Sequence, residues 1–141
     1  MGNEGIIKYY TNYKNKTDKM GYKKITETKV YKLAFELAMK VYEISKRFPK
    51  EEIYSLTDQV RRSSRSVCSS LAEAHRKRLY PAHFISKVSD SDMENAETQT
   101  WLEFALACKY ITQNEHDELL NLSEETGRLL SHMIHNPEKY R

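Results

Sequence analysis

Six basic side chains lie close together in the sequence and could bind phosphate groups. They are Arg61, Arg62, Arg65, Arg76, Lys77 and Arg78. Between Gln59 and Arg78 the only acidic residue is Glu73. At about 100° per residue, the first four basic residues fall within an arc of about 100°, opposite the apolar side of the helix that carries them. Because an inert solvated face usually mixes both signs of charge, this bias favours a phosphate-binding site.

Two readings of this stretch stay open at the level of sequence. Soluble helices normally have charged outer faces, and Arg76, Lys77 and Arg78 would suit a helix C-terminus without any ligand. The serines that lie among the basic residues are Ser63, Ser64, Ser66, Ser69 and Ser70. They are small, so they either allow a neighbouring helix to approach closely or hydrogen-bond a phosphate.

Acidic residues gather in a later segment, SDSDMENAETQ, and could do different chemistry. They are Asp90, Asp92, Glu94 and Glu97. We interpret them, in order of preference, as a solvated face, as partners of the basic residues in the same or a neighbouring subunit, or as a metal site.

Other signs of catalysis or metal binding are weak. His132 and His135 could share a metal, but near a helix C-terminus they also suit the dipole. No Glu-x-x-His, His-Glu-x-x-His, phosphate-binding loop or glycine fingerprint occurs in the sequence. We therefore expect no cofactor, no metal and no enzymatic activity.

Composition restricts the class of protein further. The chain of 141 residues has a net charge of +3 and fits one domain. It lacks both a run of about 18 apolar residues and the apolar stretch of a signal peptide, so we expect a cytoplasmic protein. Cys68 and Cys108 are isolated and are interpreted as reduced thiols.

Charge is distributed unevenly along the chain. Residues 1–87 hold 19 basic and 9 acidic residues, whereas residues 88–141 hold 4 and 11. Such a dipolar chain suggests an anionic partner for its first part, or head-to-tail contact between copies.

Hydrophobic periodicity predicts an all-α protein. Helices are expected from residue 27 or 28 to 47, from 49 or 50 to about 78, from 81 to about 109, and from 112 to about 135. Pro49 and Pro81 suit first helical turns, and Thr112 with Glu115 forms a capping box. Because the connections are short, consecutive helices should be antiparallel neighbours in an up-down-up-down four-helix bundle.

The apolar positions of these helices predict the core. In the second helix they are Ile53, Leu56, Val60, Val67, Leu71 and Ala74. In the third helix they are Phe84, Ile85, Val88, Met93, Ala96, Trp101, Leu102, Ala105 and Leu106. Gly127 inside the fourth helix costs about 1 kcal/mol relative to alanine, and a close contact between helices would offset this cost.

The N-terminal residues 1–27 are predicted to form a disordered or loosely attached basic arm. Lysines alternate there with tyrosines, and there is no helical period. Such a composition could hold single-stranded nucleic acid by charge and stacking, and a leader without a role explains it equally well. The bundle is expected over residues 28–136, with a C-terminal tail over residues 137–141.

Three stretches, FPKEEIYSLTDQVRRSSRSV, SSLAEAHRKR and AETQTWLEFALACKYIT, resemble the four-helix-bundle proteins encoded in intervening sequences of 23S ribosomal RNA genes. The resemblance spans roughly Tyr31 to Ile134. It implies a homopentameric barrel of bundles and kinship with the accessory variability protein of diversity-generating retroelements, which binds nucleic acid and a reverse transcriptase. Cys68 stands where a proline is common, and Ala74 where a glycine often stands, so the second helix is expected to be straighter and longer here.

These observations lead to two hypotheses of different classes. The first is a non-enzymatic oligomer that binds RNA or DNA phosphates, with little sequence specificity because no base-reading motif is visible. The second is a protein adaptor or scaffold whose basic face meets an acidic partner, such as an accessory subunit of a retroelement reverse transcriptase.

Overall fold

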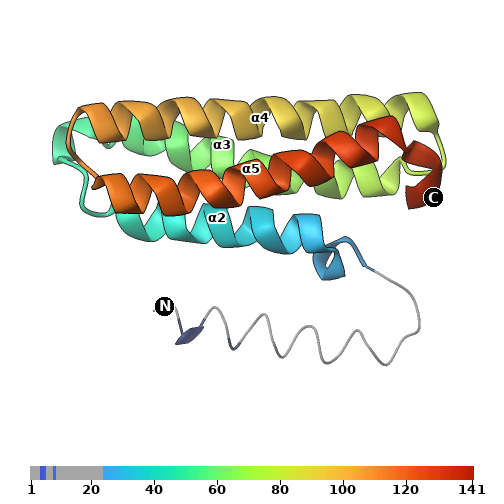
Figure 1. Ribbon diagram of the computed structural model, residues 1–141, viewed down its shortest axis with the longest axis horizontal. Coiled ribbons are helices and arrows are strands. Elements are labelled where there is room, and N and C mark those ends of the chain that lie inside the picture. Colours follow the sequence, from blue (N-terminus) through green and yellow to red (C-terminus); the bar gives the residue numbers. More distant parts are fainter. Residues whose placement is uncertain (1–3, 6–7, 9–23) are drawn as a thin grey trace.

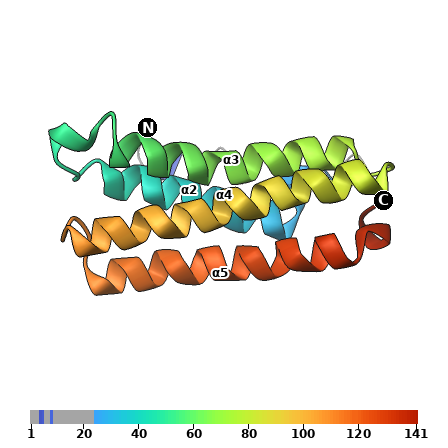
Figure 2. The same ribbon diagram turned by 90° about the horizontal axis from the view of Figure 1, so that it is seen from above.

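The computed structural model describes residues 4–5, 8 and 24–141. Its elements are η1 (Ile25–Glu27), α2 (Lys29–Ser45), η2 (Lys50–Glu52), α3 (Leu56–Arg76), α4 (Pro81–Ala107), α5 (Gln113–His135) and η3 (Pro137–Tyr140). The long helices run antiparallel to their neighbours in sequence, and α5 packs against α2 to close the bundle (Figures 1 and 2). The expected all-α four-helix bundle is therefore confirmed. Most of the predicted basic arm lies outside the described residues.

Local signals place the helix ends. The Thr28 side chain caps α2 by accepting a hydrogen bond from the Tyr31 amide at 3.4 Å. At the start of α5, the Glu115 amide donates to the Thr112 hydroxyl at 3.2 Å, and the Thr112 amide donates to the Glu115 carboxylate at 2.9 Å. The predicted capping box is thus confirmed, and Pro81 begins α4 as expected.

The connection between α2 and α3 is longer than the sequence suggested. The chain forms only the 3-10 turn η2 after Pro49 and then leaves helical conformation at Ser55, where φ is −127° and ψ is −109°. The prediction that Ile53 belongs to the core is therefore wrong, because 52% of its surface is exposed in this turn. Phe48 instead fills this end of the core and packs against Tyr110, with ring centroids 5.5 Å apart.

The middle of α4 departs from the apolar pattern expected of a core helix. Met93 is 63% exposed and Ala96 is exposed, so their assignment to the core is wrong. The buried positions in this part of α4 are Ser91, Asn95 and Thr98. This part of α4 therefore presents polar side chains to the core and apolar side chains to solvent. The register of α4 against the other helices, and not hydrophobicity alone, decides which face of the helix is buried.

The core consists of two apolar clusters separated by a polar layer. One cluster, near the C-terminus of α3, is formed by Val30, Ala34, Val67, Cys68, Leu71, Ala74, Phe84, Val88, Leu130 and Met133. The other, near the connection between α2 and α3, is formed by Leu37, Val41, Phe48, Leu56, Val60, Leu102, Ala105, Ile111 and Leu119. Between them lie the buried residues Ser63, Ser64, Ser91, Asn95, Thr98, Ser123 and Thr126.

Hydrogen bonds across helices satisfy this polar layer. Asn95 Nδ2 donates to the Ser123 carbonyl at 2.9 Å, and the Ser123 hydroxyl donates to Asn95 Oδ1 at 2.8 Å. The hydroxyls of Ser63 and Thr98 lie 2.8 Å apart across α3 and α4. Buried hydroxyl and amide groups are tolerated only when paired in this way. Ser63 therefore serves the contact of α3 with α4, while the Ser64 hydroxyl donates to the Arg61 carbonyl of its own helix at 3.1 Å, and because both serines are buried they are not available to a phosphate.

Gly127 lies against this layer, and alanine at this position is expected to be no more stable than glycine. An alanine Cβ would lie 3.3 Å from Asn95 Nδ2, and Asn95 cannot shift without breaking its two bonds to Ser123. The steric cost should cancel the gain of about 1 kcal/mol in helix propensity. Chemical denaturation measures the free energy of unfolding of the Gly127→Ala variant. In an Asn95→Ala background, Gly127→Ala should become stabilising. A gain of the full amount of about 1 kcal/mol in the wild-type background would contradict the packing described here.

Candidate nucleic-acid interface

The six basic residues predicted as a site lie on α3 or just beyond its end, in two groups. The first group is Arg61, Arg62 and Arg65; the second is Arg76, Lys77 and Arg78. At about 1.5 Å per residue, about 16 Å of helix separates Arg65 from Arg76. A ligand that contacts both groups must therefore be extended, as a polynucleotide is, because one phosphate cannot bridge this distance.

The first group is completed by Tyr42 of α2 and by Lys46, the C-cap of that helix, neither of which the sequence predicted as a site residue. The guanidinium carbons of Arg61 and Arg65 lie 5.0 and 5.7 Å from the centroid of the Tyr42 ring. The Lys46 ammonium lies 4.7 Å from the same centroid. Each distance is within the range of about 6 Å at which cation–π attraction operates. We call Tyr42, Lys46, Arg61 and Arg65 the α2–α3 basic face.

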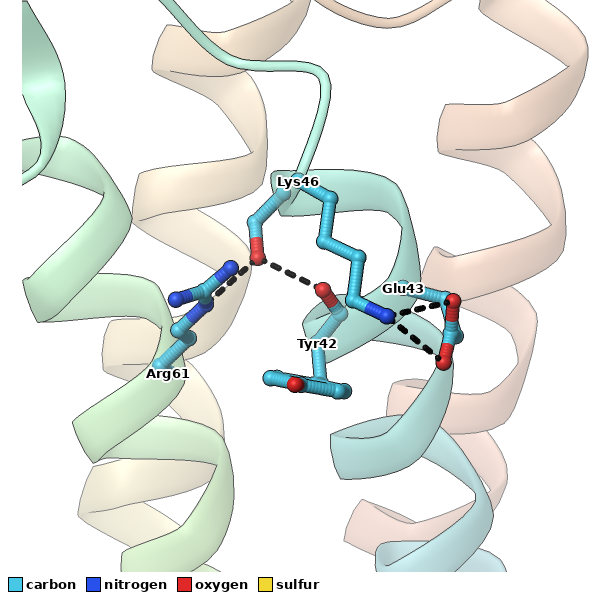
Figure 3. Close-up of polar contacts among 5 residues, drawn as sticks. Tyr42, Glu43, Lys46 and Arg61 are labelled. Carbon is cyan, nitrogen blue, oxygen red and sulfur yellow. Dashed lines mark hydrogen bonds and ion pairs between the residues drawn. The ribbon is translucent and has the colours of Figure 1, made fainter. Parts of the chain in front are cut away.

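Arg61 is held in place by the neighbouring helix. Its Nε donates a hydrogen bond to the Ser45 hydroxyl at 2.8 Å, and that hydroxyl lies 3.0 Å from the carbonyl of Tyr42, to which it donates (Figure 3). Lys46 reaches the Glu43 carboxylate at 3.3 Å on the side away from Arg61 (Figure 3). The half-buried Arg61 is thus more rigidly placed than the exposed arginines that the sequence pattern suggested.

The positive charges of α3 are largely uncompensated. Arg62 lies 3.6 Å from Asp58, one helical turn away. For the other five basic residues, no carboxylate of the described chain lies within the 4.0 Å of an ion pair. An excess of one sign of charge on one face attracts polyanions.

The opposite side of α2 provides a contrast. There Lys29 pairs with Glu125 at 3.2 Å and Arg47 pairs with Glu115 at 2.5 Å, both across to α5. Lys40 pairs with Glu118 and with Glu36. The Arg47 guanidinium, followed by the Thr112 amide, lowers the pKa of Glu115. Lys29, Lys40 and Arg47 on the α2–α5 side are therefore neutralised by glutamates of α5, whereas Arg61 and Arg65 of the α2–α3 basic face have no ion pair among the described residues.

Among the described residues, the acidic residues of α4 form no ion pair within 4.0 Å with the basic residues of α3, although the charge of Arg62 acts on Glu94. Asp90 lies 3.8 Å from Lys87, whose ammonium contacts Glu73 at 2.8 Å. Glu97 accepts a hydrogen bond from the Trp101 indole at 3.3 Å. Burial, followed by the neighbouring Glu97, raises the pKa of Glu94. Of the interpretations offered above, a largely solvated face agrees with these contacts.

The second basic group lies at the end of α3. Arg76 and Lys77 are exposed, while Arg78 is half-buried and donates to the His75 carbonyl at 2.9 Å. Burial, followed by the charges of Arg78 and Arg76, lowers the pKa of His75. The neutral form of His75 therefore dominates at neutral pH, and the charge of this group comes from its arginines and lysine.

Side chains that could support catalysis or metal binding are occupied or dispersed. His132 Nδ1 lies 2.6 Å from the Tyr140 hydroxyl, and His135 Nδ1 lies 2.8 Å from the Ser131 carbonyl. Within the described ranges, no group of three potential metal ligands occurs. Burial raises the pKa of the Cys68 thiol to about 12, while Cys108 is exposed, and both are free. Among the helices that the structure describes, none combines the length with the apolar composition that a membrane span requires.

Comparison with known proteins identifies relatives of this chain. Residues 26–132 match the family model described as 23S rRNA-intervening sequence protein. A crystal structure of a protein of unknown function from the S23 ribosomal protein family of Bacteroides thetaiotaomicron is similar, with a TM-score of 0.68 and 27% identity over 74% of this chain and 97% of that one. No curated protein matches the sequence.

Proposed function

Because the chain belongs to the family of 23S rRNA-intervening sequence proteins, we propose that it binds nucleic-acid phosphates, RNA in particular, as a non-enzymatic protein. The α2–α3 basic face supplies the main contacts, and Arg76, Lys77 and Arg78 extend the contact along α3. The observation that carries the proposal is the contrast between two sets of basic residues. Those that face α5 from α2 and its end pair with glutamates, whereas five of the six on α3 or just beyond its end have no described acid within 4.0 Å.

The chemistry of the face supports low sequence specificity. Arginine and lysine contacts to phosphate position a nucleic acid without reading its bases. Tyr42 is the aromatic residue of the face, and its ring is already surrounded by Lys46, Arg61 and Arg65. We therefore expect similar affinities for unrelated RNA sequences of equal length.

A salt titration tests this function. Anisotropy of a labelled single-stranded RNA measures affinity at several salt concentrations, and log affinity should fall linearly with log salt, with a slope of about −0.7 for each neutralised phosphate. The rival function is a protein adaptor that meets an acidic partner, such as a reverse transcriptase. Undetectable RNA and DNA binding at low salt, together with a co-purifying protein partner, would establish the adaptor instead.

We also propose that the chain forms a homo-oligomer, with a pentamer as the expected state. The exposed residues Met93, Ala96, Thr100 and Phe104 recur every three or four positions on α4, so they lie along one side of the helix. Met93 is 63% and Phe104 is 55% exposed. Three of these four residues are apolar, and such an exposed apolar strip on one face of a bundle is typical of a surface that packs against another protein. Because the charge of the chain changes sign along its length, head-to-tail contacts between copies would bring opposite charges together.

Replacing both Met93 and Phe104 by glutamate should dissociate the oligomer. Light scattering on the wild type should give about five times the chain mass of 16.6 kDa, and the variant should give a smaller mass, because charge at an apolar contact opposes burial. The matched control replaces Ile53 and Leu79, which are also exposed, by glutamate and should keep its mass. A monomeric wild type at micromolar concentration would refute self-association.

A further inference from the structure

A cavity of about 530 Å³ opens at the end of the bundle where α2 begins and α3 and α5 end. This is the end at which the C-terminus lies in Figure 1. The apolar wall of the cavity is formed by Ile25, Val30, Phe84, Leu129, Met133 and Tyr140. Val30, Phe84 and Met133 are buried, and the Tyr140 ring stacks on Phe84 with centroids 6.1 Å apart. The volume lies within the range of about 300 to 1,000 Å³ that is typical of small-molecule sites.

Basic side chains surround this apolar wall. They are Lys29, Arg78, Lys139 and Arg141. Lys29 is paired with Glu125, and none of the described residues that line the cavity is an aspartate or a glutamate. Arg78 is fixed by its hydrogen bond to the His75 carbonyl, so its charge is held at the rim. Because Lys29 is paired, the positive potential that attracts an anion to this apolar surface comes from Arg78, Lys139 and Arg141, for which the described residues provide no ion pair.

The polar groups of the cavity determine which anion fits. Apart from the cations, the polar side chains that line it from the described part of the chain are Thr28, His75 and Tyr140. The Tyr140 hydroxyl already lies 2.6 Å from His132 Nδ1. A nucleobase would leave several of its donors and acceptors without partners against a wall of aliphatic side chains, and each such group is costly to bury. A hydrocarbon chain has no such groups.

We propose that the cavity binds a small anionic amphiphile, a carboxylate with an aliphatic body. The carboxylate lies at the rim between Arg78 and Lys139, and the hydrocarbon packs on Val30, Phe84 and Met133. A planar guanidinium suits a carboxylate because it can donate two parallel hydrogen bonds. The inference is separate from the proposed nucleic-acid function, although Arg78 belongs to both sets of residues.

Calorimetric titration of the full chain with hexanoate, octanoate and decanoate tests the proposal. Affinity should rise about fourfold for each added CH₂ group until the cavity is filled. Octanol, which lacks the charge, should bind more weakly than octanoate. Equal affinity for octanol and octanoate, no saturable binding of any carboxylate, or tighter binding of adenosine monophosphate than of octanoate would each overturn the proposal.

Variants locate the site. Changing Arg78 and Lys139 to glutamine should weaken octanoate binding at least tenfold and leave octanol binding unchanged. The charge-matched control, Lys50→Gln with Arg62→Gln, lies away from the cavity and should bind octanoate as the wild type does. Leu129→Trp, if it folds, should also block octanoate binding by filling the cavity. The variant with Arg78 and Lys139 changed to glutamine tests the site even if Leu129→Trp does not fold. Unchanged octanoate affinity in the glutamine pair would refute this site.

The result is also independent of the RNA measurement. A variant with Arg61 and Arg65 changed to glutamine should lose RNA affinity and keep octanoate affinity. If octanoate does not bind while RNA does, only the present inference fails. If octanoate binds and RNA does not, only the proposed nucleic-acid function fails.

Discussion

Replacing Asn95 by alanine should lower the free energy of unfolding by about 1 to 3 kcal/mol, the cost of leaving a buried polar group without its partner. Asn95 is 2% exposed and exchanges two hydrogen bonds with Ser123 on α5. Its loss leaves a buried hydroxyl without an acceptor across the helices and removes packing against Gly127. Chemical denaturation followed by circular dichroism measures the change.

The matched control for Asn95 is Ser131→Ala, an exposed polar position on α5. It should alter the free energy of unfolding by no more than about 0.5 kcal/mol. The double variant Asn95→Ala with Ser123→Ala should lose less than the sum of the two single changes, because both remove the same interaction. Strict additivity would show that the contact between Asn95 and Ser123 contributes little to stability.

Replacing Arg61, Arg65 and Arg76 by glutamine should lower RNA affinity at low salt at least tenfold, which corresponds to about 1.4 kcal/mol or more. Arg65 and Arg76 are exposed, so their replacement should hardly change stability. Arg61 donates to Ser45, and its replacement should cost about 1 kcal/mol of stability. The variant therefore remains folded at room temperature, and the loss of affinity reports on phosphate contacts.

A control with the same change in net charge isolates the effect of position. Lys29, Lys40 and Arg47 are paired with glutamates of α5. Changing these three to glutamine removes as much charge, yet RNA affinity should fall far less. If the two triple variants lose affinity equally, net charge and not the α2–α3 basic face governs binding.

The bundle itself could be predicted from the sequence because its determinants are local. The capping box at Thr112, the proline at position 81 and the short connections each act within a few residues. The exposure of Ile53 could not be predicted in the same way. Its spacing from Leu56 fits a continuous helical stripe, but Ser55 leaves the helical conformation in the turn that carries the chain from α2 to α3.

The wrong assignment of Met93 to the core, where Asn95 is buried instead, has a different cause. Helical periodicity places these two residues on different faces, but it does not decide which face meets α5 when both carry polar and apolar groups. Asn95 and Ser123, which exchange two hydrogen bonds, are 28 residues apart in the sequence. Only the register of α4 against α5 brings them together.

The candidate site was predicted in part. All six basic positions belong to α3 or its end, and the pairing of Arg62 with Asp58 follows the i, i+4 spacing that a sequence shows. Tyr42 and Lys46 were missed because they join the site only through the antiparallel packing of α2 on α3.

The difference in salt dependence between the wild type and the Arg61, Arg65 and Arg76 variant tests the role of the α2–α3 basic face most directly. Each phosphate contact that disappears should flatten the log–log slope for single-stranded RNA by about 0.7, so the loss of three contacts should flatten it by about 2. The slope of the Lys29, Lys40 and Arg47 control should match the wild type. Identical slopes for the wild type and the Arg61, Arg65 and Arg76 variant would contradict the assignment of this face to nucleic acid.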